Sequence, residues 1–255
     1  MGRLLVNGIE DAGIPANDPG LVRGLTVFET MRTYGRVPFR LEQHLDRLEA
    51  SAETTGIAMP PRSALRAEIL AALDDDDQWV RCLLTAGGNR VIETGDIDAS
   101  RIGRPVSVAF VDWEPTPWLP GSVKHTSRAA WQLAARERGV DEVIFVSTDG
   151  GLLEANRSNV VAVVDGTVCT SEADGRILAG VTRSTMLEAA GNAGLPVRVG
   201  HLPADTDFDE LYLSSTMKEL APTVLGGRTL RGPVGARLLQ AFRDLVLAEC
   251  GTTTT

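Results

Sequence analysis

The segment Gly121-Ser-Val-Lys-His-Thr-Ser127 holds the first of three groups that predict the fold of this chain. It carries a single primary amine, that of Lys124. The second segment, Glu154-Ala-Asn-Arg-Ser-Asn159, carries a carboxylate among amide and hydroxyl groups. The third, Leu178-Ala-Gly-Val-Thr-Arg183, opens a pattern of apolar residues that is typical of a helix. An amine, a carboxylate and a helix start therefore follow one another in the second half of the chain.

These are the groups that pyridoxal 5′-phosphate (PLP) needs. The amine forms a Schiff base, the carboxylate faces the pyridinium nitrogen, and the backbone N–H groups of a helix start bind the phosphate. We therefore predict that Lys124 is catalytic and binds PLP together with Glu154. We predict that Gly180, Val181 and Thr182 lie at its phosphate. The ordinary roles of such residues, a solvated lysine, a strand-end carboxylate and a common helix start, remain open at this point.

Lysine is rare in this chain. Lysine and arginine together number 25, but Lys124 and Lys218 are the only lysines. A Schiff-base enzyme built on this sequence thus has two candidate residues. Lys218 follows Ser214-Ser-Thr-Met, whose hydroxyl groups suggest a loop on the phosphate side. We predict that Lys218 lies near the site and that Lys124 is the Schiff-base lysine.

The composition limits the classes of protein to which this chain can belong. The chain has 255 residues, 43% of them hydrophobic and 23% charged, as in soluble globular proteins. A net charge of −9 argues against nucleic acid or an anionic membrane as a main partner. Cys82, Cys169 and Cys250 are scattered and odd in number, so we expect reduced thiols in a cytoplasmic protein. Neither a disulfide framework nor a metal site is expected.

Strand and helix patterns alternate along the chain and predict an α/β fold. Strands are predicted at 26–34, 80–85, 106–111, 142–147, 160–164 and 210–215, helices at 41–55, 62–73, 128–138, 181–192 and within 232–250, and loops at 15–20 and 86–90. The proline-rich segment 114–121 is predicted to link two lobes. The N-terminal lobe would comprise residues 1–113 and the C-terminal, PLP-binding lobe residues 122–255.

The motifs together resemble the fold-type IV PLP enzymes, which include branched-chain aminotransferases, D-amino acid aminotransferases and aminodeoxychorismate lyases. The likeness covers nearly the whole chain. Phe28-Glu-Thr-Met-Arg32 and the segment 39–48 look like the N-terminal signature of that family, and the three later motifs follow in its order. The resemblance implies a smaller N-terminal α/β lobe and a larger C-terminal lobe with a barrel-like sheet and helices. It also implies PLP in the cleft and a homodimer.

The resemblance also assigns residues. It implies that Arg47 binds the phosphate, that Ser215 and Thr216 form a second loop on the phosphate side, and that Asn159 belongs to the cofactor site. Glu154 falls on the carboxylate that faces the pyridine nitrogen. Further candidates, for contacts with a small amino substrate, are Phe28, Thr30, Arg32, Arg90 and Lys218.

The chain departs from the family pattern at several positions, and these bear on the reaction. Ala86 stands where D-amino acid aminotransferases use an arginine for the substrate carboxylate. The residues after Lys124-His125 are Thr126-Ser127 instead of Leu-Asn. The resemblance favours an aminodeoxychorismate lyase-like enzyme of folate biosynthesis, which converts 4-amino-4-deoxychorismate to 4-aminobenzoate and pyruvate. Two alternatives stay open: an aminotransferase for branched-chain or D-amino acids with a keto-acid acceptor, and a non-catalytic homologue with a structural or interaction role.

Overall fold

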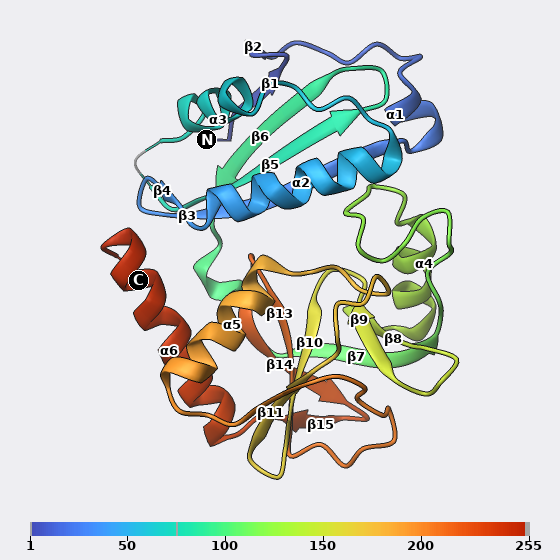
Figure 1. Ribbon diagram of the computed structural model, residues 1–255, viewed down its shortest axis with the longest axis vertical. Helices are drawn as coiled ribbons and strands as arrows, with labels where there is room; N and C mark the ends of the chain where they lie inside the picture. Colours follow the sequence, from blue (N-terminus) through green and yellow to red (C-terminus); the bar gives the residue numbers. More distant parts are fainter. Residues whose placement is uncertain (1, 75, 253–255) are drawn as a thin grey trace. The chain divides into compact units, whose positions relative to one another are not determined.

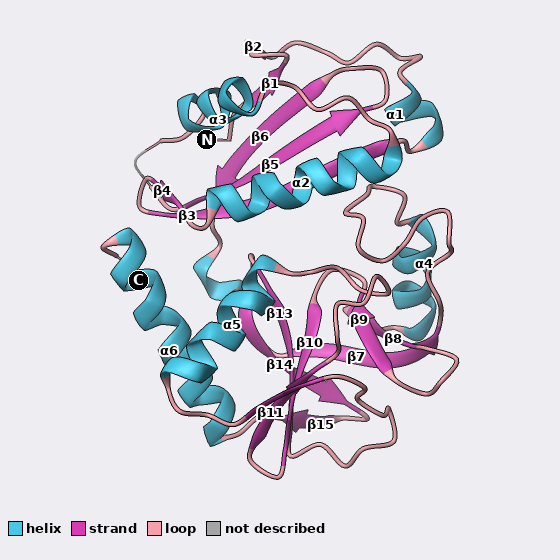
Figure 2. Ribbon diagram, viewed as in Figure 1, coloured by secondary structure: helices cyan, strands magenta, loops and turns pink. Residues whose placement is uncertain are grey.

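The computed structural model describes residues 2–74 and 76–252, which form two compact units. The first unit comprises the residues up to Asp98, Val123–Ser127 and the residues from Ala248 onward, and the second comprises Ala99–Ser122 and Arg128–Leu247. Helices and strands alternate in both (Figure 2), so the predicted α/β class is confirmed. The predicted linker, residues 114–121, lies within the second unit. The lobe limits 1–113 and 122–255 stay a prediction.

The first unit contains an antiparallel sheet with helices packed on it. Its strands occur in the order β2-β1-β6-β5-β3-β4. The strands are β1 (Leu4–Val6), β2 (Ile9–Glu10), β3 (Thr26–Tyr34), β4 (Val37–Pro38), β5 (Gln78–Thr85) and β6 (Arg90–Asp96), and the helices are α1 (Pro19–Arg23), α2 (Leu41–Thr55) and α3 (Arg62–Ala71). In Figure 1, α2 runs along this sheet beside β3.

Buried and partly exposed side chains alternate along β3, so the two faces of the sheet differ. Val27, Glu29 and Met31 have no exposed surface, and the Glu29 carboxylate meets side chains of α2. Phe28 and Thr30 point to the opposite face and remain partly exposed. Directly paired residues of neighbouring strands share a face, so each face continues onto β5.

A stripe of leucines holds α2 in place. Leu41, Leu45 and Leu48 recur at helical spacing and are buried. The helix ends at Gly56, whose left-handed backbone lets its N–H bond to the carbonyl oxygen of Ala52. The apolar side of α2 thereby covers the inner face of the sheet.

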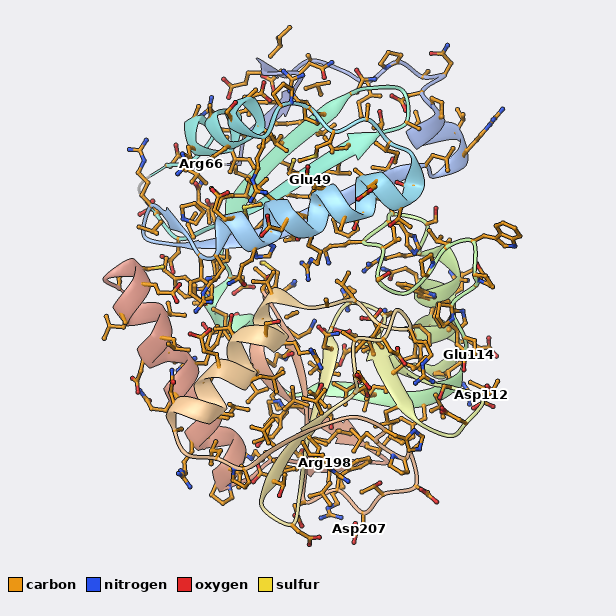
Figure 3. The ribbon with its side chains drawn as sticks, in the orientation of Figure 1. Glu49, Arg66, Asp112, Glu114, Arg198 and Asp207 are labelled. Atoms are coloured by element: carbon orange, nitrogen blue, oxygen red, sulfur yellow. The ribbon has the colours of Figure 1, made fainter. Side chains whose placement is uncertain are left out.

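The outer side of α2 is acidic and pairs with arginines of α3. Glu42 accepts hydrogen bonds from Arg62 and Arg66, and Arg62 also pairs with Asp46. Figure 3 labels Glu49 on α2 and Arg66 on α3. Exposed pairs of this kind contribute about 0–1 kcal/mol each. The leucine stripe therefore contributes more than these charges to the docking of α2.

The second unit is built around a closed ring of six strands. The ring runs β10-β13-β14-β7-β8-β9 and closes where β9 pairs with β10. Outside the ring, β11 and β12 extend from β10, and β15 pairs with β14. The strands are β7 (Val106–Asp112), β8 (Glu142–Val146), β9 (Leu152–Ala155), β10 (Asn159–Val164), β11 (Thr167–Thr170), β12 (Val197–Val199), β13 (Glu210–Ser215), β14 (Glu219–Leu225) and β15 (Arg228–Leu230). The predicted barrel-like sheet is confirmed, and its closing pair is Glu154 with Asn159.

The helices after β6 are η1 (Ala99–Arg101), α4 (Ala129–Arg138), α5 (Val181–Asn192) and α6 (Pro233–Cys250). α4 packs on β7 and β8, and α5 packs on β13 and β12. The residues of α6 beyond Leu247 group with the first unit. Alternate residues of the ring strands, such as Ile144 and Leu211, form one core. The residues between them form a second core with α4, in which the rings of Trp131 and Phe145 lie 5.4 Å apart. In the described part of the chain, no helix combines the length and apolar character that crossing a membrane requires.

Local features explain why sequence patterning missed elements such as α1, β6, β14 and β15. Residues 15–20 were expected to be a loop, but α1 begins at Pro19. The expected loop 86–90 gives way at Arg90 to β6, in which the adjacent apolar residues Val91 and Ile92 disturb the alternation. β14 contains Pro222, which argues against a strand in a sequence pattern. The short β15 follows a glycine pair without a run of apolar residues.

Asp18 joins three segments of the first unit. Its carboxylate is buried and accepts hydrogen bonds from the Gly20 N–H (2.6 Å), Thr85 Oγ1 (2.7 Å) and Asn89 Nδ2 (2.6 Å). The Gly87 N–H also bonds to it. A Cβ atom at Gly20 or Gly87 would collide with this carboxylate, so the close approach requires glycine. The start of α1 is thereby fixed to the turn between β5 and β6.

We expect Asp18→Asn to destabilise the protein in a pH-dependent way. Burial raises the pKa of Asp18, but the hydrogen bonds outweigh it and leave the pKa below its ordinary value. A carboxyl group with a depressed pKa stabilises the fold above its unfolded pKa and loses that contribution as pH falls through the folded pKa. The variant should lose about 1.5–3 kcal/mol at neutral pH, the usual contribution of hydrogen bonds to a charged group. Denaturant unfolding at neutral and acidic pH measures this, and an equal loss at both would contradict it.

Candidate functional site

Lys124 lies in the short segment Val123–Ser127, which belongs to the first unit. The Phe28 N–H donates to the Lys124 carbonyl oxygen (2.9 Å), and the Lys124 N–H donates to Ser51 Oγ of α2 (3.1 Å). One residue on, His125 forms a bridge with Val27. The ammonium nitrogen lies 4.9 Å from the centroid of the Phe28 ring. Backbone contacts with β3 and α2 thus fix the main chain from which this amine projects.

One side of α2 carries polar residues towards β3. His44, Arg47 and Ser51 recur at helical spacing. Glu29 of β3 accepts hydrogen bonds from Arg47 Nε (2.6 Å) and Arg47 Nη2 (2.7 Å), and its Oε2 atom lies 2.8 Å from His44 Nδ1. Glu29 has no exposed surface. The first unit therefore holds Arg47, a predicted site residue, against a buried carboxylate, whereas the Lys124 amine lies at the Phe28 ring, on the residue next to Glu29 in β3.

The protonation of this group follows from its surroundings. Burial raises the pKa of Glu29, but the charge and hydrogen bonds of Arg47 outweigh it, with help from His44, and the net pKa is far below its ordinary value. The pKa of His44 is lowered, chiefly by burial, although Glu29 opposes the shift. Glu29 is therefore ionised and His44 neutral at neutral pH. Because a carboxylate only accepts hydrogen bonds, the proton of the imidazole belongs on Nδ1.

In the second unit, Glu154 and Asn159 lie side by side at the closure of the barrel. Glu154 Oε2 accepts hydrogen bonds from the Leu178 N–H (3.1 Å) and from Asn159 Nδ2 (3.3 Å). Asn159 Nδ2 also donates to the Leu178 carbonyl oxygen (2.9 Å). Both side chains are buried. Neutral donors thus orient the Glu154 carboxylate.

The start of α5 approaches the same residues. Gly180 precedes the helix, and a Cβ atom there would collide with Asn159 Oδ1. Among the described residues, no side chain caps the first turn of α5, which contains Val181 and Thr182. Arg183 is buried and anchors this turn, because its Nη2 atom donates to the Ser171 carbonyl oxygen (2.6 Å). The uncapped N–H groups and the helix dipole suit an anion such as a phosphate.

The turn after β13 completes this part of the second unit. Ser214 pairs in register with Asn159. In the part of the chain that the structure describes, Ser214 Oγ is buried without a hydrogen-bond partner. Ser215 and Thr216 follow, and the Lys218 N–H closes the turn on the Ser215 carbonyl oxygen (3.1 Å). Within the second unit, a buried carboxylate, an uncapped helix start and an unsatisfied hydroxyl are groups that fit the ring and phosphate of PLP.

The second lysine has a different environment. Lys218 Nζ lies 2.5 Å from Glu142 Oε1 and donates to Ser158 Oγ (3.1 Å). Glu142 has no exposed surface. A lysine that neutralises a buried carboxylate acts as a cation and is costly to displace. This contact supports Lys124 over Lys218 as the nucleophilic amine, and a substrate contact of Lys218 stays a prediction.

Two arginines predicted to contact substrate also carry ion pairs. Arg32 is buried, its Nη2 atom lies 3.1 Å from Asp77 Oδ2, and its guanidinium stacks on the Tyr34 ring at 4.4 Å. Arg90 donates through Nε and Nη2 to the two carboxylate oxygens of Glu68, at 2.6 and 2.5 Å. These contacts stabilise the first unit, and a role in substrate binding stays a prediction for both residues.

A third arginine, Arg81, escaped the sequence analysis. It pairs in register with Thr30 and so lies on the same face as Thr30 and Phe28, whose ring contacts the Lys124 amine. Its pair with Glu93 is long, at 3.3 Å, and both side chains are about two-fifths exposed (43% and 40%). The alternation of side chains within the predicted strand 80–85 could have indicated this placement, but only once the register with β3 was known.

Comparisons with known proteins agree with this fold. A family model described as amino-transferase class IV matches residues 26–224, which include parts of both units. A probable branched-chain-amino-acid aminotransferase of Thermotoga maritima is 31% identical over 87% of this chain and 86% of its own length. An aminodeoxychorismate lyase of Bacillus subtilis is 30% identical over 84% and 81%. The PLP-bound form of a hypothetical aminotransferase from Mycobacterium tuberculosis superposes with a TM-score of 0.86 at 27% identity, covering 98% of this chain and 100% of that one.

Proposed function

The chain belongs to the class IV aminotransferases, a family of PLP-dependent enzymes, and we propose that it is an aminodeoxychorismate lyase-like member. Its substrate would be 4-amino-4-deoxychorismate, and its products 4-aminobenzoate and pyruvate, a step of folate biosynthesis. Because the family consists of enzymes, the alternative of a non-catalytic homologue is not retained.

The residues in the turn after β5 indicate which reaction the protein catalyses. Ala86 stands in this turn where D-amino acid aminotransferases resembling this chain use an arginine for the substrate carboxylate. The nearest arginine along the turn, Arg90, is held by both oxygens of Glu68. Among the described residues 85–90, no other cation is available to a carboxylate. This observation counts against a D-amino acid substrate and so supports the lyase over that alternative.

The residues have separate roles in the proposal. PLP, when bound, supplies an electron sink for the bond changes in the substrate. Lys124 would anchor the cofactor, and its Nζ atom would take the proton from C4 of the substrate. Glu154 would keep a proton on the pyridine nitrogen. Arg47 would hold the phosphate together with the N–H groups of Val181 and Thr182.

The remaining predicted residues would support this arrangement. Asn159 orients the Glu154 carboxylate, and Gly180 leaves room for Asn159 at the start of α5. Ser215 and Thr216 would add hydroxyl and backbone donors on the phosphate side. Phe28 would confine the Lys124 amine, since its ring lies against that group.

We also propose that Arg81 binds a carboxylate of the substrate. It lies beside Thr30 on the sheet face that carries Phe28. Exposed ion pairs such as that of Arg81 with Glu93 contribute about 0–1 kcal/mol, so a substrate carboxylate can replace Glu93 at little cost. Arg32 and Arg90 would first have to leave shorter and less exposed pairs.

We expect Arg81→Leu to raise KM for the carboxylate substrate by about 10- to 100-fold, the factor that corresponds to losing a charge-assisted hydrogen bond. Steady-state kinetics measures the change. Arg66→Leu serves as the control, because Arg66 also forms an exposed pair, on the outer side of α2. An unchanged KM in the Arg81 variant, or an equal rise in both variants, would contradict the assignment.

Stoichiometry separates the lyase from the aminotransferase. With 4-amino-4-deoxychorismate alone, the lyase forms pyruvate and 4-aminobenzoate in equal amounts and needs no amino acceptor. An aminotransferase for branched-chain or D-amino acids turns over only when a keto acid is present. Product formation without a keto acid supports the proposal, and turnover that depends on a keto acid overturns it in favour of the alternative.

We further propose a cytoplasmic homodimer. Leu21, Val22 and Leu25 at α1 are 65%, 58% and 46% exposed, an apolar cluster of the kind that protein interfaces cover. The acidic composition supports a small-molecule enzyme without nucleic acid or membrane as partner. Light scattering on the purified protein tests the dimer, and a mass of one chain at working concentrations would exclude it.

A further inference from the structure

We propose that Lys218 is a positioning residue, which fastens the turn after β13 to the turn between β9 and β10 so that both meet the cofactor. The inference rests on the proposed PLP site and gives Lys218 a role there that needs no contact with cofactor or substrate. All the residues that carry it belong to the second unit.

The ammonium group of Lys218 joins two other segments of the barrel. Its Nζ atom lies 2.5 Å from Oε1 of Glu142, the first residue of β8, and donates to Ser158 Oγ (3.1 Å). Ser158 lies in the turn between β9 and β10, and its hydroxyl donates to the two carboxylate oxygens of Glu142 (3.3 and 3.2 Å). One buried carboxylate thus binds a residue from each of the two turns.

The two turns lie at the same end of the barrel and carry predicted cofactor residues. The turn after β13 begins with Ser215, which is predicted on the phosphate side. The turn between β9 and β10 ends at Asn159, whose amide orients Glu154. The pairing of β10 with β13 ends at Asn159 and Ser214. Beyond this last backbone pair, the side chain of Lys218 connects the two turns.

The backbone of the turn after β13 has to be held in place. The Lys218 N–H donates to the Ser215 carbonyl oxygen (3.1 Å), and the Lys218 carbonyl oxygen accepts from the Gly103 N–H (3.2 Å). Glu219 follows with a φ of 56°, in the left-handed region that favours glycine. Another residue stays there only where its surroundings fix it, and Arg243 Nε donates to the Glu219 carboxylate (2.9 Å). Two consecutive charged side chains therefore anchor this turn.

Stability alone gives little reason for the Lys218 pair. Glu142 has no exposed surface, and only 18% of the Lys218 side chain is exposed. A buried pair of this kind contributes little more than well-packed apolar residues of similar volume. Arg157 Nε also approaches Glu142, but at 3.8 Å and with half of its side chain exposed. A fixed position for the turn is what the closer cation adds.

Charge and position lead to opposite expectations for the two members of the pair. If Lys218 attracted the phosphate through its charge alone, Glu142 would weaken that attraction, and Glu142→Gln would bind PLP more tightly. If Lys218 positions the turn, Glu142→Gln loosens the contact that Lys218→Met removes, because an amide holds an ammonium group less firmly than a carboxylate does. Our inference requires that both variants bind PLP more weakly.

The experiment compares PLP with pyridoxal, which lacks the phosphate. Dissociation constants are measured for both compounds with the whole chain after removal of cofactor. For Lys218→Met, we expect the constant for PLP to rise by about 10- to 100-fold, the factor for losing a hydrogen bond to a charged group. For Glu142→Gln, which keeps part of the contact, the rise should be about 3- to 10-fold. The constant for pyridoxal should stay within about threefold in both variants.

Two further variants serve as controls. Glu210→Gln removes the charge of another buried carboxylate, at the opposite end of β13, and should leave the ratio of the two constants unchanged. Lys218→Gln keeps a donor for Glu142 and serves if Lys218→Met does not fold. It should show a smaller loss of PLP binding, again without a matching loss for pyridoxal.

Three results would overturn the inference while the PLP site stands. The first is tighter binding of PLP by Glu142→Gln, which would mean that the charge of Lys218 acts on the phosphate directly. The second is an equal loss of PLP and pyridoxal, which would mean that the pair serves stability alone. The third is a raised KM for substrate in Lys218→Met with an unchanged ratio of the two constants, which would make Lys218 a substrate contact. If the wild-type protein bound no PLP, the proposed function would fail, and the inference with it.

Discussion

Replacing Lys124 with alanine is expected to lower kcat by about a thousandfold or more and to abolish the visible absorbance band that PLP gains when a lysine binds it. The residue would supply both the covalent anchor and the proton-transfer group, and no second amine can take its place in the first unit, where the described residues include no other lysine. The absorbance spectrum with added PLP and the initial rate with saturating substrate measure the two effects separately.

Lys218→Met is the matched control. Lys218 neutralises the buried Glu142, so this variant should lose stability and keep the absorbance band. A band that persists in Lys124→Ala and disappears in Lys218→Met would move the anchor to Lys218. It would also contradict the interpretation of Lys218 as a structural cation.

Glu154→Gln is expected to reduce kcat by about a hundredfold to a thousandfold, the range for removing one preorganised electrostatic partner of a reacting group. An amide cannot keep the pyridine nitrogen protonated as a carboxylate can, and the electron sink is weakened. The amide oxygen can still accept from the Leu178 N–H, so the fold around β9 should survive. We therefore expect PLP to remain bound while turnover falls, as single-turnover kinetics on the loaded enzyme would show.

Glu210→Gln controls for the loss of a buried carboxylate in the same unit. Glu210 accepts hydrogen bonds from the Tyr212 hydroxyl (2.6 Å) and from the Val234 and Gly235 N–H groups at the start of α6. Its replacement should lower the unfolding free energy and leave kcat nearly unchanged. A similar fall of kcat in both variants would mean that Glu154 acts through stability, not through the cofactor ring.

The sequence alone was sufficient for features that depend on neighbouring residues. The strand at 26–34, the helix at 41–55 and the helix that starts after Gly180 follow from periodicity and from turn chemistry, both of which act over a few residues. The proposed cofactor residues also lie in short motifs, so their order along the chain was enough to identify the family. Where a short-range signal was interrupted, as by Pro222 in β14, the prediction failed.

Only the tertiary structure decided which charged groups are available for chemistry. The sequence does not distinguish Lys218, Arg32 and Arg90 from a reactive cation. In the structure, however, each has a carboxylate partner that the fold brings from a distant segment. The same holds for Arg81, whose face of the sheet depends on its register with β3. The closure of the barrel through Glu154 and Asn159 also depends on the pairing of whole strands. Long-range pairing is set by the burial of complementary surfaces, which no local pattern encodes, so the sequence determined the chemical groups of this protein and the fold decided their partners.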